Sequence, residues 1–363
     1  MRLRLDCFGN TAIGCAAIRG GAPSGTGERP QQRAGNDSLP AKQHSAKMNM
    51  LNIDTGHIVL AVLLLASILL SIRFKDIAKR NTRRLKDYRS QLSKEAHLAR
   101  LKEYKNSPVK RKYAYFTSLT GGYESFKVPE YFDPTFDYYI FTDDENLKVF
   151  EPFKKILISK PGEDPVRVSR RVKLNPFEML PGYEYAVWVD ASFLVRNSLE
   201  PYVSKVQRAE ADLGVFPHPE RNSYEEEAAA CIRKGKDSEE IIQAQLECYK
   251  TQYDIKAIND QPLLAMGVFI ANLKSETCRL FFDCWREEYQ RFSRRDQLSA
   301  PFALNAVRPK YILLESTADL AHQHNKYMFE IYNHSTQAGY TTPEYLPETT
   351  EVSRLPEFVD EKR

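Results

Sequence analysis

The sequence predicts an α/β protein with a mainly parallel, mixed sheet flanked by helices, preceded by a single transmembrane helix. From residue 113 onward, short apolar segments of strand length alternate with helical patterns, which is typical of a parallel sheet covered by helices on both faces. An uncharged apolar segment, residues 58–72, precedes them. The chain has 363 residues, 42% of them hydrophobic, so it can bury a sizeable core.

Charge is distributed unevenly along the chain. Residues 73–112 carry 15 basic and 4 acidic side chains, whereas residues 113–363 carry 30 basic and 40 acidic ones. An acidic domain beside a basic segment argues against nucleic-acid binding and points to anionic lipid near the basic segment. The six cysteines form no C-x-x-C pair, which argues against a zinc module or a disulfide scaffold.

The first segment, residues 1–47, is rich in Gly, Pro, Gln and Ser and shows no lasting hydrophobic period. We expect it to be disordered, or to be an over-extended start with Met48 or Met50 as the natural initiator.

A membrane anchor is expected over residues 57–74. Its uncharged core of 15 residues is shorter than the roughly 20 residues of a usual span, although the flanking His57 and Arg73 can extend it. A cleaved signal peptide has a similar apolar length, but no A-x-A site follows and no positive cluster precedes. Eight Lys or Arg residues follow the core closely and two precede it, so the charge bias predicts a single-pass protein with its domain in the cytoplasm. The Golgi lumen is the alternative.

Residues 75–111 are expected to form a basic juxtamembrane stalk. Apolar side chains recur there at mostly helical spacing, namely Leu85, Tyr88, Leu92, Leu98 and Leu101, which indicates an amphipathic helix. The pattern lasts barely two heptads, short of the three or four that identify a coiled coil. A solvated stalk near acidic head groups is therefore favoured.

The folded domain is expected over residues 112–330, followed by a C-terminal tail at 331–363. Apolar segments predict strands at 113–119, 137–142, 155–159, 184–190, 212–216, 265–271 and 311–315. Helical patterns lie at 168–180, 198–208, 223–252, 273–292 and 295–306. Ligands of open α/β sheets bind outside the carboxyl ends of the strands, so the residues after each strand are where chemistry is expected.

Two of these strand ends carry weak signals. Gly121 and Gly122 follow the first strand, where they could let the backbone approach a nucleotide. The pattern is neither G-x-G-x-x-G nor a P-loop, and a plain turn explains it equally well. Asp143 and Asp144 follow the second strand, where a solvated turn also accounts for them.

The strongest signal is Asp190, which ends the apolar strand EYAVWVD. A carboxylate there is unfavourable unless it is paired or bound to metal, with a helix cap or a turn as the alternative. Together with Ser192 it suits a hard cation that bridges a diphosphate.

Upstream basic residues could pair with phosphates or could form a charged helix face. They are Arg167, Arg170, Arg171 and Lys173.

A fourth candidate region lies near the C-terminus of the domain. Asp296 and Gln297 are expected to open a helix, and His322 and His324, with Lys326, follow the last strand. Two histidines at i, i+2 near a candidate metal carboxylate suggest ligands, although single histidines are more often structural.

Five ordered motifs resemble a known family: FTSLTGGYESF, DYYIFTDDENL, SRRVKLNPFEMLPGYEYAVWVDASFLV, FPHPERNSYEEEAAAC and RRDQLSAPFAL. They are similar, over about residues 112–330, to the glycosyltransferase-like domain of plant Golgi proteins involved in seed-coat mucilage, a former domain of unknown function with bacterial members. More distantly, LPGY before the strand that ends at Asp190 is similar to family 8 nucleotide-sugar glycosyltransferases. The resemblance implies a GT-A-like fold.

The family 8 resemblance implies a metal site, and this sequence differs from the family's metal motif at one position. Asp190 stands at the first acid of the metal motif, and Ser192 stands where the second acid would be. The resemblance implies Mn²⁺ or Mg²⁺, with Asp190, Ser192, His322 and His324 as the candidate ligands.

The same resemblance implies roles in catalysis and donor binding. Asp296 and Gln297 match an Asp-Gln pair near the reacting anomeric carbon and are expected to be catalytic, while Ala265 replaces an expected Asn beside the sugar. The expected donor-binding residues are Thr117, Gly122, Tyr123, Asp143, Arg170, Lys173, Asp190 and Lys326. His218, Arg221 and Glu225, in the mucilage-type motif, are expected on the acceptor side.

The expected function is that of a membrane-anchored glycosyltransferase. It would move a sugar from a nucleotide-diphosphate donor, a UDP-sugar, to a glycan, cell-envelope or lipid-linked acceptor. The departures at Ser192 and Ala265 keep a second expectation open, an inactive membrane-bound domain that binds a nucleotide sugar, a glycan or a protein. A lipid hydrolase is disfavoured because the sequence has neither G-x-S-x-G nor H-E-x-x-H.

Overall fold

A computed structural model describes residues 55–122, 124–158, 162–315, 327–332 and 342–355. The chain divides into two compact units, residues 1–73 and 74–363. The segment 1–47 lies outside the described residues.

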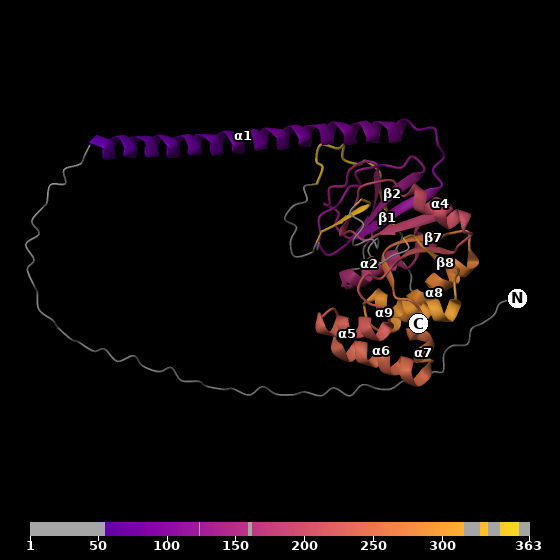
Figure 1. The fold of residues 1–363 in the computed structure, drawn as a ribbon. Coiled ribbons are helices and arrows are strands. Elements are labelled where there is room, and N and C mark those ends of the chain that lie inside the picture. The colour runs from indigo at the N-terminus through magenta and orange to yellow at the C-terminus, as the bar shows by residue number, and fades with distance from the viewer. Residues whose placement is uncertain (1–54, 123, 159–161, 316–326, 333–341, 356–363) are drawn as a thin grey trace, which may run out of the picture. The chain divides into compact units, whose positions relative to one another are not determined.

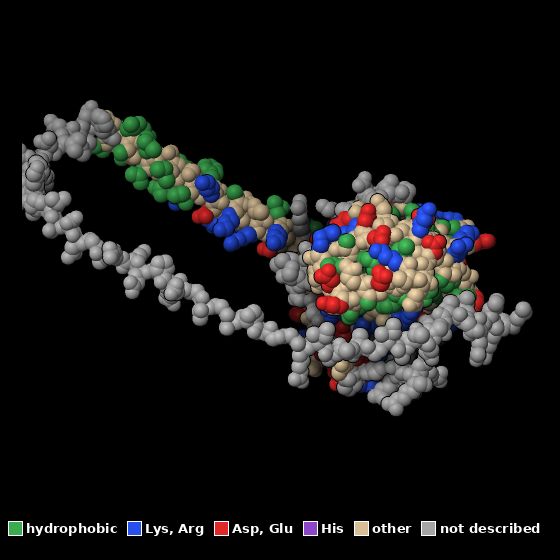
Figure 2. All heavy atoms as spheres, turned by 90° about the horizontal axis from the view of Figure 1, so that it is seen from below, with side chains coloured by type: hydrophobic (Ala, Val, Ile, Leu, Met, Phe, Trp, Pro, Cys, Tyr) green, Lys and Arg blue, Asp and Glu red, His purple; other side chains and the backbone are tan. Residues whose placement is uncertain are grey.

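Helix α1 (Thr55–Asn106) contains both the expected anchor and the expected stalk. In the described part of the chain it is the one helix that is long and apolar enough to cross a membrane, and none of its most apolar stretch is buried. Hydrophobic side chains cover the first part of α1, and Lys and Arg gather on the part that follows (Figure 2). The helix is consistent with a single-pass anchor.

The last turns of α1 belong to the core of the second unit. Leu101 and Tyr104 are buried, and the Tyr104 hydroxyl donates a hydrogen bond to the carbonyl of Phe136 (2.9 Å). The ring of His97 is stacked on Phe132 with centroids 5.0 Å apart. A solvated stalk was expected throughout 75–111, but this end of it packs on the domain because these side chains share one face of the helix.

Eight strands form the central sheet of the described chain (Figure 1). In the order in which they pair, they are β10 (Val352–Arg354), β3 (Phe153–Leu157), β2 (Phe136–Thr142), β1 (Tyr113–Leu119), β4 (Tyr185–Val189), β7 (Leu264–Asn272), β6 (Leu213–Pro217) and β8 (Tyr311–Leu313). Strand β7 runs antiparallel to both of its neighbours, and the other pairs are parallel. This confirms the predicted fold class.

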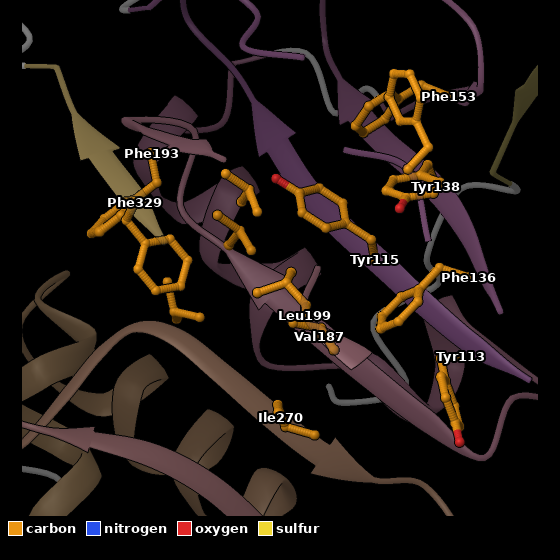
Figure 3. Close-up of a cluster of buried hydrophobic side chains, with 14 of the residues drawn as sticks. Tyr113, Tyr115, Phe136, Tyr138, Phe153, Val187, Phe193, Leu199, Ile270 and Phe329 are labelled. Carbon is orange, nitrogen blue, oxygen red and sulfur yellow. The ribbon is translucent and has the colours of Figure 1, made fainter. Parts of the chain in front are cut away.

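Both faces of the sheet are buried, because successive side chains of a strand point to opposite faces. On one face, Tyr115, Tyr138 and Val187 belong to a large apolar cluster (Figure 3). On the other face, Phe116 and Trp188 lie side by side in register and pack in a second cluster. All seven residues of β1 are therefore buried, which explains why its sequence reads as a continuous apolar segment.

Eight further helices are described in the domain. They are α2 (Pro165–Lys173), α3 (Pro176–Met179), α4 (Glu200–Arg208), α5 (Tyr224–Arg233), α6 (Glu239–Gln252), α7 (Ile255–Asn259), α8 (Glu276–Arg291) and α9 (Asp296–Val307). Helices α5, α6 and α7 lie beside α9 (Figure 1). They share a third apolar cluster that includes Tyr224, Tyr249 and Leu298.

Two predicted helices are each divided in the structure. The pattern at 168–180 separates into α2 and α3 before Pro176, since the residue preceding a proline disfavours helical geometry. The pattern at 223–252 separates into α5 and α6 at Gly235, which has a φ of 56° and ends the helix as glycine commonly does. Ser238 then caps α6 by accepting a hydrogen bond from the amide of Ile241.

Three short strands were not predicted. Strand β5 (Phe193–Val195) pairs with β9 (Phe329–Ile331) in a separate two-stranded sheet. Strand β10 pairs with β3 at the edge of the main sheet, so the fold extends into residues where a tail was expected. Each of these strands has three residues, too few to show an alternating pattern.

Candidate active site

A cavity of about 820 Å³ opens at the carboxyl edge of the sheet. Its walls come from the ends of β1 and β4, the residue after β6, the start of β7, and helices α2 and α9. This is the edge at which ligand-binding residues were expected from the sequence. The cavity lining includes eight of the predicted site residues, Arg170, Lys173, Asp190, Ser192, His218, Arg221, Asp296 and Gln297.

Two cations and two carboxylates form a connected group in this cavity, which we call the charge quartet: Arg170, Lys173, Asp190 and Asp296. The ammonium of Lys173 lies 2.5 Å from Asp296 Oδ2 and 3.4 Å from Asp190 Oδ1. The Nε of Arg170 lies 3.1 Å from Asp296 Oδ1. Lys173 and Asp296 are 1% and 4% exposed, whereas the side chains of Arg170 and Asp190 are partly exposed to the cavity. The formal charges of the quartet cancel.

The protonation state of Asp296 follows from its neighbours. Burial alone would raise the pKa of its carboxyl group, but Arg170, Lys173 and Arg295 together hold that pKa well below its usual range. Asp296 is therefore ionised at neutral pH, with one cation on each oxygen.

Asp190 is held at the end of β4 by three contacts. The indole Nε1 of Trp188 donates a hydrogen bond to Oδ1 (2.6 Å), the same oxygen that faces Lys173. The backbone amide of Asp190 donates to the carbonyl of Gly267 on β7 (2.8 Å). The carboxylate at the end of this apolar strand is thus paired, as its position required.

Gln297 joins α9 to the beginning of β7. Its Nε2 donates to the carbonyl of Leu264, and its Oε1 accepts from the amide of Met266 (3.4 Å). The indole of Trp285 donates to the carbonyl of Asp296 (2.9 Å). The first turn of α9 is therefore fixed from both sides, which presents the Asp296-Gln297 pair to the cavity.

His218 and Arg221 form another wall together with Glu227. The Nδ1 of His218 accepts from the backbone amides of Glu220 (3.2 Å) and Arg221 (3.0 Å). Burial and the nearby Arg221 lower the pKa of His218, which favours a neutral ring. The guanidinium of Arg221 pairs with the buried carboxylate of Glu227.

Four predicted site residues lie outside the lining of the cavity. Thr117 is buried within β1, and Glu225 is exposed on α5, where it accepts a hydrogen bond from Asn259 (3.0 Å). Asp143 accepts from the amide of Gly121 (3.0 Å), and Gly122 has a φ of 66°. At Asp143 and Gly122, the plain turn that the sequence analysis gave as the alternative accounts for both observations.

The remaining predicted residues, Tyr123, His322, His324 and Lys326, lie outside the described residues. Within the described ranges, no group of three or more His, Cys, Asp or Glu side chains is placed to hold a metal ion. Asp190 supplies a carboxylate whose Oδ1 is already shared by Trp188 and Lys173. Among the described residues a divalent cation would have the Asp190 carboxylate and the Ser192 hydroxyl as ligands, so water and substrate phosphate would have to complete its coordination.

Sequence reasoning missed several charged residues of the cavity. Glu227, Lys236, Arg294 and Arg295 all line it. Arg294 and Arg295 directly precede the Asp-Gln pair, and this adjacency was the available signal. Nothing in the sequence around Lys236 sets it apart from other exposed lysines.

Residues 139–330 match the family model described as TOD1/MUCI70, glycosyltransferase-like domain. No curated protein sequence matches the chain. Solved structures with a related fold include the galactosyltransferase LgtC in complex with donor and acceptor sugar analogs, with 9% identity, a TM-score of 0.31, and 55% of this chain and 72% of that one covered. Another is apo mouse xyloside xylosyltransferase 1, with 11% identity, a TM-score of 0.34, and 56% and 85% covered.

These TM-scores are too low to support an argument by superposition. The family model, in contrast, spans more than half of the chain and confirms the family resemblance, although the first of the five motifs, residues 116–126, lies before the matched range. The chain belongs to the TOD1/MUCI70 family of glycosyltransferase-like domains.

Proposed function

We propose that this domain transfers a sugar from a nucleotide-diphosphate donor, a UDP-sugar, to a glycan, cell-envelope or lipid-linked acceptor. The observation that carries the proposal is the open cavity at the carboxyl edge of the sheet, where Gln297 lies beside the charge quartet. Such a cavity offers polar groups at fixed positions, which is what glycosyl transfer requires.

The transfer breaks the bond between the anomeric carbon and the diphosphate oxygen and forms a bond from that carbon to an acceptor hydroxyl oxygen, which gives up its proton. Positive charge develops on the carbon and negative charge on the leaving group, so the protein has to stabilise both. The carboxamide oxygen of Gln297 accepts one hydrogen bond, from Met266, and keeps a second lone pair. We assign this oxygen to the anomeric carbon.

Asp296 has a different role in this proposal. Each of its carboxylate oxygens faces a cation, Lys173 or Arg170, and the residue is 4% exposed, so its negative charge is already neutralised within the protein. We assign Asp296 as a positioning residue that fixes the quartet and the start of α9, in place of the catalytic role expected from the sequence.

The divalent cation expected from the resemblance stays a prediction. Among the described residues it would have Asp190 and the hydroxyl of Ser192, and its two candidate histidines lie outside them. We derive no step through it. His218 and Arg221, on the wall formed with Glu227, remain our candidates for the acceptor side.

Topology is also part of the proposal. We propose that residues 57–74 cross the membrane once and that the basic flank keeps the domain in the cytoplasm, where nucleotide sugars and the inner leaflet are both accessible. The Golgi lumen is the alternative location.

Thermal unfolding of the full-length chain in detergent tests the proposal. The chain is heated with a panel of nucleoside diphosphates and nucleotide sugars, with and without Mn²⁺. We expect one nucleotide class to raise the melting temperature, because a ligand that binds only the folded state stabilises it. Any part of the shift that requires Mn²⁺ should be lost in Asp190→Asn, and Asp283→Asn, a partly exposed carboxylate on α8, should respond like wild type.

A flat response of the folded protein to the whole panel would contradict the proposal. It would favour the second expectation, a membrane-bound domain that binds a glycan or a protein without catalysis. The replacement of the second metal acid by Ser192 is the observation that keeps this alternative open.

A further inference from the structure

Six cationic side chains line the cavity: Arg170, Lys173, Arg221, Lys236, Arg294 and Arg295. Four of them already pair with protein carboxylates. Arg170 and Lys173 belong to the charge quartet, and Arg221 pairs with Glu227. Arg294 lies 3.2 Å from Asp164 and 3.6 Å from Asp237.

Lys236 and Arg295 differ from these four. Neither has a carboxylate of the described residues within 4.0 Å, the limit that defines the ion pairs above. The buried Nε of Arg295 has no hydrogen-bond partner there, and the guanidinium interacts with the thiol of Cys231, a weak acceptor. Neither cation therefore has an ion-pair partner among the described residues, although Arg295 is close enough to Asp296 to lower the pKa of that carboxyl group, and Lys236 is exposed.

The two side chains are held on the same wall. The carboxylate of Asp237, next to Lys236, accepts hydrogen bonds from Ser293 Oγ (2.7 Å) and the amide of Arg294 (2.8 Å). These bonds fasten the α5–α6 turn, which carries Lys236, to the segment that leads into α9, which carries Arg295.

The charge quartet cannot provide the charge that a diphosphate needs. Its two cations are balanced by Asp190 and Asp296, so it presents no net positive charge to a ligand. A nucleoside diphosphate brings at least two negative charges into the cavity and needs cations that are not already neutralised. In the described cavity, these cations are Lys236 and Arg295.

We propose that Lys236 and Arg295 form the subsite for the diphosphate of a nucleotide, and that they bind it without a divalent cation. The inference rests on the proposed function and deepens it. Arg295 offers a planar fork for two phosphate oxygens, and Lys236 supplies a point charge. The two cations would neutralise the diphosphate charge in place of a divalent cation.

Calorimetric titration of the full-length chain in detergent with UDP, first in EDTA and then in Mn²⁺, tests the inference. Uridine, which lacks phosphates, serves as the second probe. We expect wild type to bind UDP with similar affinity in both buffers. Each of Lys236→Gln and Arg295→Gln should weaken UDP binding about tenfold or more, the size expected for a lost charged hydrogen bond, without changing the affinity for uridine.

Two further variants separate a binding defect from a folding defect. Lys234→Gln removes an exposed cation of the same turn that does not line the cavity and should leave UDP binding unchanged. Arg295→Lys should recover part of the affinity that Arg295→Gln loses.

The possible results are distinct. UDP binding that persists in the Lys236→Gln/Arg295→Gln double variant overturns the inference, as does binding by wild type that requires Mn²⁺ and disappears in Asp190→Asn. Failure of wild type to bind any nucleoside diphosphate or nucleotide sugar in either buffer overturns the proposed function as well.

Discussion

The ammonium of Lys173 lies 2.5 Å from a carboxylate oxygen of Asp296, and both side chains are almost completely buried. The two residues are 123 positions apart in the sequence and join the end of α2 to the start of α9. The same ammonium also faces Asp190, which directly follows β4. One lysine therefore links α2 and α9 to the end of β4.

Removing this lysine should strongly destabilise the domain. Lys173→Met leaves Arg170 as the one described ion-pair partner of the buried Asp296 carboxylate, and loss of one partner of a buried pair costs about 3–5 kcal/mol. Chemical denaturation of the full-length chain measures the loss. The control Lys112→Met, at an exposed ion pair, should change stability by less than about 0.5 kcal/mol. Equal effects of the two variants would contradict the structural role of the quartet.

The end of α1 offers a matched pair of leucines. Leu101 is 3% exposed and Leu98, three residues earlier, is 40% exposed. Leu101→Ala should lower the free energy of unfolding by about 2–5 kcal/mol, as for other buried leucines, and Leu98→Ala should change it by less than about 0.5 kcal/mol. Similar small effects at both positions would show that the helix end does not pack on the domain in solution.

His97 should make this packing sensitive to pH. Burial lowers the pKa of His97, against the opposing effect of the Pro129 carbonyl. The folded state therefore binds fewer protons than the unfolded state below about pH 6.5, the ordinary histidine pKa, and stability falls as the pH drops below that value.

His97→Gln should flatten this dependence. Melting temperatures of wild type and variant are compared between pH 7.5 and 5. Burial also lowers the pKa of His218, so some slope will remain in the variant. Parallel curves for the two proteins would rule out a contribution of His97.

The proposed cytoplasmic location predicts that the sequon Asn333-His334-Ser335 carries no glycan when the full-length chain is expressed in eukaryotic cells. It also predicts that protease added outside sealed microsomes digests the domain. A glycosidase-sensitive band that disappears in Asn333→Gln, together with protection from the protease, would place the domain in the lumen.

The strand pattern and the location of the cavity could be predicted from the sequence. Residues 113–119 form the predicted first strand without change, because a strand buried on both faces is a continuous apolar segment. Asp190 was recognisable because a carboxylate that ends such a strand needs a partner.

Other features depend on contacts between distant parts of the chain. Lys173, expected to bind the donor, lines the cavity and also contacts Asp296, 123 positions away in the sequence. No local sequence pattern encodes that contact. Lys236 reaches the cavity only because Asp237 fastens its turn to residues 293–294. The three-residue strands β5, β9 and β10 are too short to give a period.

Turnover of a nucleotide sugar by the full-length chain tests the central claim most directly. A panel of nucleotide sugars is incubated with wild type, Gln297→Ala and the control Gln252→Ala, an exposed glutamine on α6, and release of nucleoside diphosphate is measured. We predict that one donor is consumed and that Gln297→Ala lowers its turnover by about 10²–10³, the range for loss of a group that stabilises transition-state charge. Gln252→Ala should match wild type. No consumption of any donor by folded protein that binds a nucleotide would contradict the claim.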